Sequence, residues 1–230
     1  MLATSVLTTL IAALNHTHQA ARLTLSARIY GFNTLKANKG GNQKVTFFQE
    51  VRWHGRGGQG VWTASELLAK AAIHEGKYIQ SFPEFGPERM GAPMRAYTRI
   101  SDKPINLHCA IYTPDVAVVL DPTLFKTVPV AEGLTEDDAL IANTQENPFQ
   151  VRKRLNLAGP KVWTVPATDI AVKMLGRPIT NTAMLGAVAK ASGMVRLESI
   201  EKAVKERFPL KIAEKNVEVV KEAYKKARSG

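Results

Sequence analysis

The sequence predicts a layered α/β domain in which a mostly parallel sheet has helices on both faces and includes some antiparallel strands. From Val45 onward, short β-branched runs alternate with amphipathic helical patterns, which is typical of βαβ units. The run 115–120 is almost continuously apolar, as expected of a strand buried on both faces of a parallel sheet. Two strand patterns that follow a loop rich in glycine and proline predict the antiparallel part.

Residues 1–44 differ from the rest of the chain. They contain five basic residues and no acidic residue, and they end in a polar, linker-like stretch at 36–44. We expect a disordered or non-native extension here, with the domain proper at 45–230 and a native start at the codon of Val45. The apolar stretch near 7–14 is far shorter than the ~20 residues of a membrane-spanning helix. A signal peptide would need positive charge near its start, and none precedes Arg22. We therefore expect a cytoplasmic protein without membrane contact.

The first predicted unit is a strand, a helix and a second strand. Residues 46–54 are rich in β-branched and aromatic side chains, which favours a strand. Apolar residues at helical spacing predict a helix over 61–74, and Gly76 stands where a helix commonly ends. A short strand at 77–82 stops at Pro83, because proline cannot donate to a strand ladder.

The remaining elements follow a loop over 83–93. Strands at 94–100 and 105–112 are predicted to form a hairpin across 101–104. The other predicted elements are strands at 115–120, 139–143 and 161–165 and helices at 168–175, 182–192, 197–207 and 213–228.

Composition excludes several functions. The formal net charge is +11, but basic and acidic residues are mixed along the body of the chain, whereas nucleic-acid binders group their basic residues. We therefore expect no nucleic-acid partner. Cys109 is the one cysteine, which rules out an intramolecular disulfide and a cluster or zinc site built on several thiolates of this chain. We expect no metal site in this chain.

The sharpest local signal is Gly55-Arg-Gly-Gly-Gln-Gly60, between a predicted strand and a predicted helix. Glycines there allow a tight turn, and free N–H groups at a helix start favour an anion. The side chains of Arg56 and Gln59 could add donors. The alternative is a turn that only lets helix and strand pack closely. The six candidate ligand-binding residues are Gly55, Arg56, Gly57, Gly58, Gln59 and Gly60.

The same string matches the dinucleotide pattern G-x-G-x-x-G. That pattern expects an acidic residue at the end of the next strand to hold a ribose. Glu84 is the candidate, and it lies beyond Pro83. A free-standing, Rossmann-like nucleotide-binding oxidoreductase is therefore the alternative function.

Three other features are candidates for function. The loop containing Phe82, Phe85 and Met90 has apolar side chains that either cover the domain's own core or dock on a partner. Asn181, with Thr182 after it, is either a helix N-cap or part of a helix start that faces a ligand. His54 ends the first strand beside the glycine turn, and we interpret it as a structural histidine.

Two ordered motifs resemble the gamma subunit of pyruvate (2-oxoacid):ferredoxin oxidoreductases. Val51-Arg-Trp-His-Gly-Arg-Gly-Gly-Gln-Gly60 is similar to the opening strand and loop of that family. Phe82-Pro-Glu-Phe-Gly-Pro-Glu-Arg-Met-Gly-Ala-Pro93 is similar to its second signature. Segments 115–121 and 181–187 are similar to later parts, so the resemblance runs from about Val45 to the C-terminus.

The resemblance implies a complex that converts a 2-oxoacid and coenzyme A to acyl-CoA and CO2 and passes electrons to ferredoxin. The 2-oxoacid is pyruvate or 2-oxoisovalerate, and the gamma chain is one that the two complexes can share. Thiamine diphosphate and iron–sulfur clusters would belong to partner chains, which are alpha, beta and delta subunits. This chain would have no complete active site and would contact coenzyme A through the glycine turn, with Asn181 and Thr182 as lesser candidates.

The second signature would then face partner subunits. Its predicted interface residues are Phe82, Phe85, Glu88, Arg89 and Met90. Family members often have two adjacent arginines in this signature, whereas Arg89 is followed by Met90 here.

Overall fold

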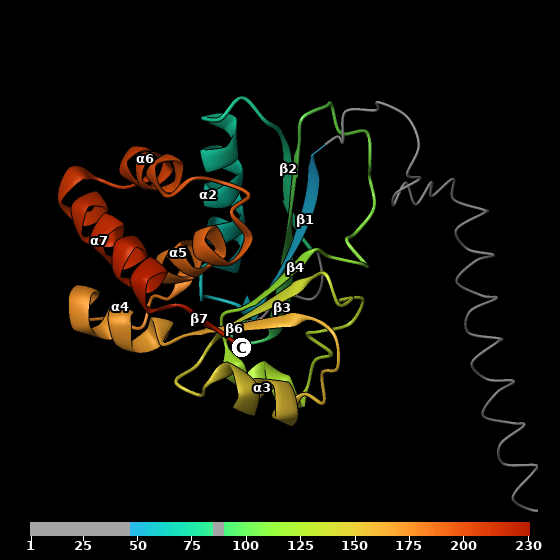
Figure 1. Ribbon diagram of the computed structural model, residues 1–230. Coiled ribbons are helices and arrows are strands. Elements are labelled where there is room, and N and C mark those ends of the chain that lie inside the picture. The colour runs from blue at the N-terminus through green and yellow to red at the C-terminus, as the bar shows by residue number, and fades with distance from the viewer. Residues whose placement is uncertain (1–46, 85–89) are drawn as a thin grey trace, which may run out of the picture. The chain divides into compact units, whose positions relative to one another are not determined.

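The computed structural model describes residues 47–84 and 90–230, and all of them belong to one unit, Val45–Gly230. The expectations for residues 1–44 and the initiation at Val45 lie outside the described residues. Seven strands form a single sheet in the order β2-β3-β1-β4-β5-β6-β7. The layered α/β prediction is confirmed (Figure 1).

The centre of the sheet is parallel and its edges are antiparallel. β1 (Phe48–Arg56), β4 (Val116–Val119), β5 (Ala139–Asn143) and β6 (Lys161–Val165) run parallel to their neighbours in that order. β3 (Pro93–Ser101) pairs antiparallel with β1 on one side and with β2 (Tyr78–Pro83) on the other. At the opposite edge, β7 (Arg228–Ser229) pairs antiparallel with β6.

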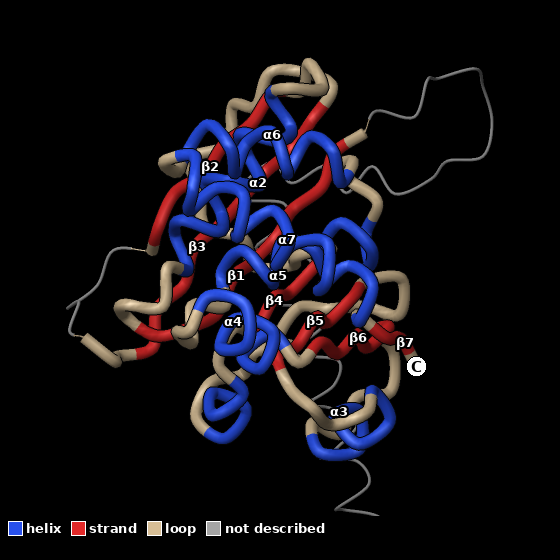
Figure 2. The backbone as a smooth tube through the Cα atoms, turned by 90° about the vertical axis from the view of Figure 1, so that its left-hand side faces the viewer, coloured by secondary structure: helices blue, strands red, loops and turns tan. Residues whose placement is uncertain are grey.

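The main core lies between the sheet and a layer of helices, which Figure 2 shows in front of the strands. This layer contains α2 (Val61–Ile73), α4 (Ala167–Leu175), α5 (Asn181–Ser192), α6 (Leu197–Arg207) and α7 (Leu210–Lys226). Strand residues such as Val51 and Trp53 pack against it. Because side chains alternate along a strand, Arg52 and His54 lie on the other face.

That other face has a smaller apolar cluster around Ala117, Val119 and Leu140. The 3-10 helix η1 (Pro122–Lys126) and α3 (Pro148–Arg154) cover it through Leu124 and Val151. The sequence prediction contained neither of these two short helices. With them, both faces of the sheet are covered by helices, as the sequence predicted.

The predicted strand at 105–112 is wrong, since no strand forms there. β3 already has strand partners on both sides, so the hairpin across 101–104 has no free edge to use. Side chains on the sheet bind the backbone of this segment instead. Gln80 Nε2 donates to the carbonyl of Leu107 over 2.8 Å, and Arg99 donates to the carbonyl of Cys109 over 2.9 Å.

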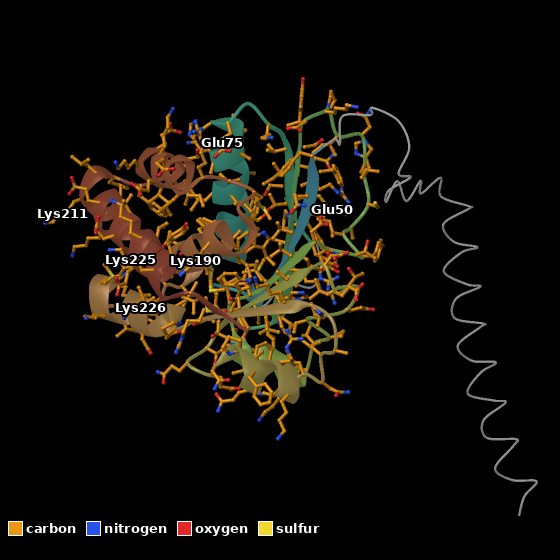
Figure 3. The ribbon with its side chains drawn as sticks, in the orientation of Figure 1. Glu50, Glu75, Lys190, Lys211, Lys225 and Lys226 are labelled. Carbon is orange, nitrogen blue, oxygen red and sulfur yellow. The ribbon has the colours of Figure 1, made fainter. Side chains whose placement is uncertain are left out.

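The last predicted helix also ends earlier than expected, because Arg228 belongs to β7 and not to the helix. Lys190 on α5 holds the end of α7 by donating to the carbonyls of Lys225 and Ala227, over 3.1 and 2.9 Å (Figure 3). A cation at the C-terminus of a helix satisfies its free carbonyls and complements its dipole. No helix in the described part of the chain has the length and apolarity needed to cross a membrane.

Candidate functional site

The glycine turn lies where the order of the strands reverses. After β1 the chain passes through α2 to β2 and β3 on one side, and it later returns to β4 on the other side of β1. In open α/β sheets, ligands bind outside the carboxyl ends of the strands at such a switch point. Residues 57–60 follow β1, and Asp121 follows β4 two residues after its last residue. The topology therefore brings the turn and Asp121 to the same edge.

The main chain of the turn is held by the end of the second signature. Gly57 N–H donates to the carbonyl of Ala92 over 2.9 Å, and Gly91 N–H donates to the carbonyl of Gly57 over 3.1 Å. Gln59 N–H closes the turn on the carbonyl of Arg56 over 3.0 Å. The turn and the end of the second signature thus form one hydrogen-bonded unit.

Several amides beyond these bonds have no acceptor among the residues that the structure describes. Within residues 47–84 and 90–230, no acceptor lies within hydrogen-bond reach of the N–H groups of Gly58, Gly60, Val61, Trp62 and Thr63. Three of these belong to the first turn of α2, whose N-cap has no side-chain hydrogen bond. Unpaired amides at a helix start carry partial positive charge and bind anions.

Steric constraints account for two of the glycines. A Cβ atom on Gly55 would lie 2.4 Å from Val61 Cγ2, so Val61 at the start of α2 would have to shift to admit any side chain there. Gly60 has φ of 72°, and a Cβ atom on it would lie 2.5 Å from Asn181 Nδ2. The turn therefore also brings the N-termini of α2 and α5 together. Both the packing role and the geometry for anion binding are present in one turn.

The side chains of Arg56 and Gln59 are engaged within the protein. Asp121 Oδ2 accepts from Arg56 Nε over 3.1 Å and from Gln59 Nε2 over 2.9 Å. Arg56 also donates to Thr123 Oγ1 over 2.8 Å and to the carbonyl of Gly91 over 3.0 Å. Gln59 Oε1 accepts from Arg56 N–H over 2.8 Å. In this conformation both side chains are held by bonds within the protein, and the main-chain amides named above have no acceptor among the described residues.

Asp121 is a charged carboxylate at neutral pH. Burial alone would raise its pKa, but hydrogen bonds from Thr123 and Gln59 and the charge of Arg56 outweigh burial, so the pKa is lower than usual. The sequence analysis did not single out Asp121 or Thr123. An acidic residue directly after the buried run 116–120 was the available signal, because such residues lie at the carboxyl edge of a parallel sheet.

Asn181 and Thr182 occupy different environments. Asn181 is the first residue of α5 and Thr180 is its N-cap, so the interpretation of Asn181 as the N-cap is corrected by one position. The Asn181 side chain accepts from Thr182 N–H over 2.8 Å and lies beside Gly60. Thr182 is fully buried and donates its hydroxyl to Asn216 on α7 over 2.8 Å. Asn181 lies next to the turn, whereas Thr182 faces the helical core.

The second signature is described only at its two ends. Phe82 is half-buried on β2, with its ring centroid 5.1 Å from that of Tyr97. Met90 is 94% exposed beside the turn. The other three predicted interface residues, Phe85, Glu88 and Arg89, lie outside the described residues.

Glu84 does not stand where a ribose-binding acid would. It directly follows β2, an edge strand that is antiparallel to β3 and separated from β1 by β3. Its carboxylate accepts from the Tyr97 hydroxyl over 2.8 Å and lies 3.6 Å from Arg95. The dinucleotide pattern requires a parallel strand next to the first one, so this geometry argues against the free-standing nucleotide-binding alternative.

His54 is buried on the polar face of β1, as expected for a structural residue. Its Nε2 accepts from Arg52 Nε over 3.0 Å, and its Nδ1 is buried without a partner among the described residues. Burial, together with the charges of Arg52 and Arg95, lowers the pKa of His54 to about 3. Burial and the hydrogen bond to Glu84 raise the pKa of the nearby Tyr97 to about 12. His54 is therefore neutral across the physiological range.

No group of three or more His, Cys, Asp or Glu side chains in the described ranges is arranged to hold a metal ion. The fold and its carboxyl edge together define an open α/β domain of the kind that binds ligands at a switch point between its strands.

Comparison with known proteins identifies the family. The model of the pyruvate ferredoxin/flavodoxin oxidoreductase family matches residues 50–226. The chain belongs to this family, as a gamma-type subunit of a 2-oxoacid oxidoreductase complex.

Three similar proteins are named as subunits of pyruvate synthase, pyruvate oxidoreductase or pyruvate/ketoisovalerate oxidoreductases. The pyruvate/ketoisovalerate oxidoreductases common subunit gamma of Pyrococcus abyssi is 52% identical over 179 residues, which are 78% of this chain and 97% of the relative. Pyruvate synthase subunit PorC of Methanocaldococcus jannaschii is 50% identical over 76% of this chain and 94% of the relative. The crystal structure of a pyruvate oxidoreductase subunit from Thermotoga maritima has a TM-score of 0.72 and 44% identity, covering 80% of this chain and 98% of that one.

Proposed function

We propose that this chain supplies the phosphate-binding part of a coenzyme A site within a complex that oxidises pyruvate or 2-oxoisovalerate. The reaction joins the acyl group to the coenzyme A thiol, releases CO2 and passes two electrons to ferredoxin in the cytoplasm. Thiamine diphosphate and the iron–sulfur clusters belong to the partner alpha, beta and delta subunits in this proposal. The chain itself binds and orients the carrier and has no complete active site.

One observation supports the proposal: where β1 turns into α2, at the switch point of the sheet, several main-chain amides have no acceptor among the described residues. Coenzyme A has phosphate groups at one end and a thiol at the other. A helix start holds a phosphate through N–H groups and the helix dipole without needing a basic side chain. This matters here because Arg56 and Gln59 are bound to Asp121. Asn181 Nδ2 lies beside Gly60 and is an additional donor in this proposal.

The second signature supports a role in docking. Met90 is almost fully exposed next to the turn, and methionine and aromatic residues are enriched at the centres of protein interfaces. Residues 82–94 in this proposal face a partner subunit and lead to the entrance of the active site, with Phe82, Phe85, Glu88, Arg89 and Met90 at the interface.

A pair of leucine substitutions in the purified complex tests the proposal. Gly58→Leu places a side chain among the free amides, where the nearest atom to a Cβ is Met90 Cγ at 4.0 Å. Gly76→Leu is the matched control, because Gly76 also has a positive φ, has open space around it and follows the same helix at its other end. Both changes carry a similar backbone cost.

We expect Gly58→Leu to raise the KM for coenzyme A about tenfold or more, as the loss of one or two charge-assisted hydrogen bonds implies. The KM for pyruvate should stay within about twofold, since that substrate makes no contact with the turn in this proposal. An equal change of the coenzyme A KM in Gly58→Leu and Gly76→Leu would refute the assignment.

A further inference from the structure

Asp121 is saturated by donors from the turn and from the start of η1. Its Oδ2 accepts from Arg56 and Gln59, while its Oδ1 accepts from Thr123 N–H over 2.9 Å and from Thr123 Oγ1 over 2.7 Å. Its side chain is 12% exposed, and that of Arg56 is 29% exposed. This carboxylate is thus a built part of the edge of the sheet and is held in one place.

Arg56 and Asp121 together carry no net charge at the place where the ligand would bind. Arg56 and Asp121 are 3.1 Å apart and next to the free amides. A phosphate group that approaches the turn is attracted by Arg56 and by the helix dipole, and it is repelled by Asp121. Because the two opposite charges are close together, their effects on a third charge largely cancel. The attraction that remains is that of the amides.

We propose that Asp121 is an internal counter-ion that limits how tightly the glycine turn holds the phosphate groups of coenzyme A, an inference that rests on the proposed function. Coenzyme A and its acyl thioester have the same phosphate groups, so a site that held them too tightly would slow the release of the product. Asp121 keeps Arg56 from acting as a full positive charge toward the ligand, while it also orients Arg56 and Gln59 across the turn.

Charge can be removed here with little change of shape. Asp121→Asn keeps the size of the side chain and one accepting oxygen, and its amide nitrogen leaves two of the four donors without an acceptor. Arg56 also remains bound to Thr123 Oγ1 and to the carbonyl of Gly91. Arg56→Gln removes the opposite charge. The two substitutions and their combination give local net charges of +1, −1 and 0, against 0 in the unchanged chain.

The experiment measures the dissociation constant of coenzyme A for the purified complex in all four forms, at low and at moderate salt. Pantetheine, which has the thiol but no phosphate group, is the matched probe. We expect Asp121→Asn to bind coenzyme A about three- to tenfold more tightly and with a steeper salt dependence. Arg56→Gln should bind more weakly by a similar factor, and the double variant should return close to the unchanged complex. Pantetheine should respond to none of these changes.

A purely structural role for Asp121 predicts another pattern. Both single variants and the double variant would then bind coenzyme A more weakly, and weaker binding by Asp121→Asn overturns the inference. Thermal unfolding of each complex shows whether the fold is kept. Asp121→Glu, which retains the charge, should not tighten binding; tightening by that variant would also overturn the inference. The proposed function fails separately, if Gly58→Leu leaves coenzyme A binding unchanged in the complex.

Discussion

The free energy of unfolding of the domain should fall at acidic pH because of His54, and a His54→Gln variant should lack this part of the loss. Burial and two nearby arginines lower the pKa of His54 from 6.5 to about 3 in the folded chain. Protonation therefore favours the unfolded state once the pH falls below about 6.5. The stability that the neutral ring provides is fully present above the pKa of His54 in the unfolded chain, 6.5. It is lost progressively as the pH falls toward the pKa in the folded chain, about 3.

The size of the effect follows from the two pKa values. Each unit of pKa difference corresponds to about 1.4 kcal/mol. At about pH 5, which is some 1.5 units below the unfolded pKa and still above the folded one, the loss should be about 2 kcal/mol. Glutamine can still accept a hydrogen bond from Arg52 Nε, as His54 Nε2 does over 3.0 Å, but it has no titrating group.

The assay is urea unfolding of the chain at about pH 7.5 and about pH 5, which lie on either side of the ordinary histidine pKa. Carboxylates such as Asp121 contribute equally to both proteins, so the difference between their pH-dependent losses isolates His54. The unchanged chain should lose about 2 kcal/mol more than His54→Gln. Equal losses would mean that His54 is accessible to protons in the folded state, and the argument from burial would be wrong.

Three further substitutions probe other parts of the fold by urea unfolding. Arg52→Met should cost about 2–4 kcal/mol, because the buried guanidinium donates to carbonyls of two loop segments that would lose their donor. Gly60→Ala should cost about 1–2 kcal/mol for its positive φ, and more because its Cβ would lie 2.5 Å from Asn181 Nδ2. Gly186→Ala should cost about 1–3 kcal/mol through overpacking, since its Cβ would lie 2.1 Å from the carbonyl oxygen of Val220. Losses under about 0.5 kcal/mol, the usual range for surface changes, would contradict each of these.

Sequence patterns predicted the central strands and long helices because local periodicity and burial agree there. The helix at 61–74 and the apolar run 115–120 both became elements close to their predicted bounds. The strand at 105–112 failed for a non-local reason. Its apolar residues fit a strand, but the neighbouring edge of β3 was taken by β2, which no local pattern reveals.

The short helices η1 and α3 escaped prediction because each has few residues. No helical period can develop over such a length, and the signals are the caps. Asp121 accepts from Thr123 N–H, and Asn147 forms a capping box with Gln150. A proline follows each cap, at the first helical position. Cap and proline together were readable in the sequence and would have indicated both helices.

The candidate site shows the same limit at the level of single residues. The sequence indicated the turn at 55–60, because several glycines at a strand–helix junction are typical of a tight turn that exposes its amides. It could not show that Arg56 and Gln59 are bound to Asp121, since 65 and 62 residues of chain separate the partners. Arg56 and Gln59 therefore stay predicted ligand donors, and the fold also uses both side chains to bind Asp121.

The two signatures of the family are physically coupled in this chain. Gly57 forms main-chain hydrogen bonds with Ala92 and Gly91, and Arg56 donates to the carbonyl of Gly91. A displacement of the end of the second signature must therefore stretch bonds that shape the turn. If a partner subunit binds residues 82–94, as proposed, its docking acts directly on the amides that are proposed to hold coenzyme A. The proximity of Met90 Cγ to the space beside Gly58 makes the same connection through side-chain packing. Docking and ligand binding, as proposed, then act on one hydrogen-bonded unit, through which this chain affects the chemistry of the complex.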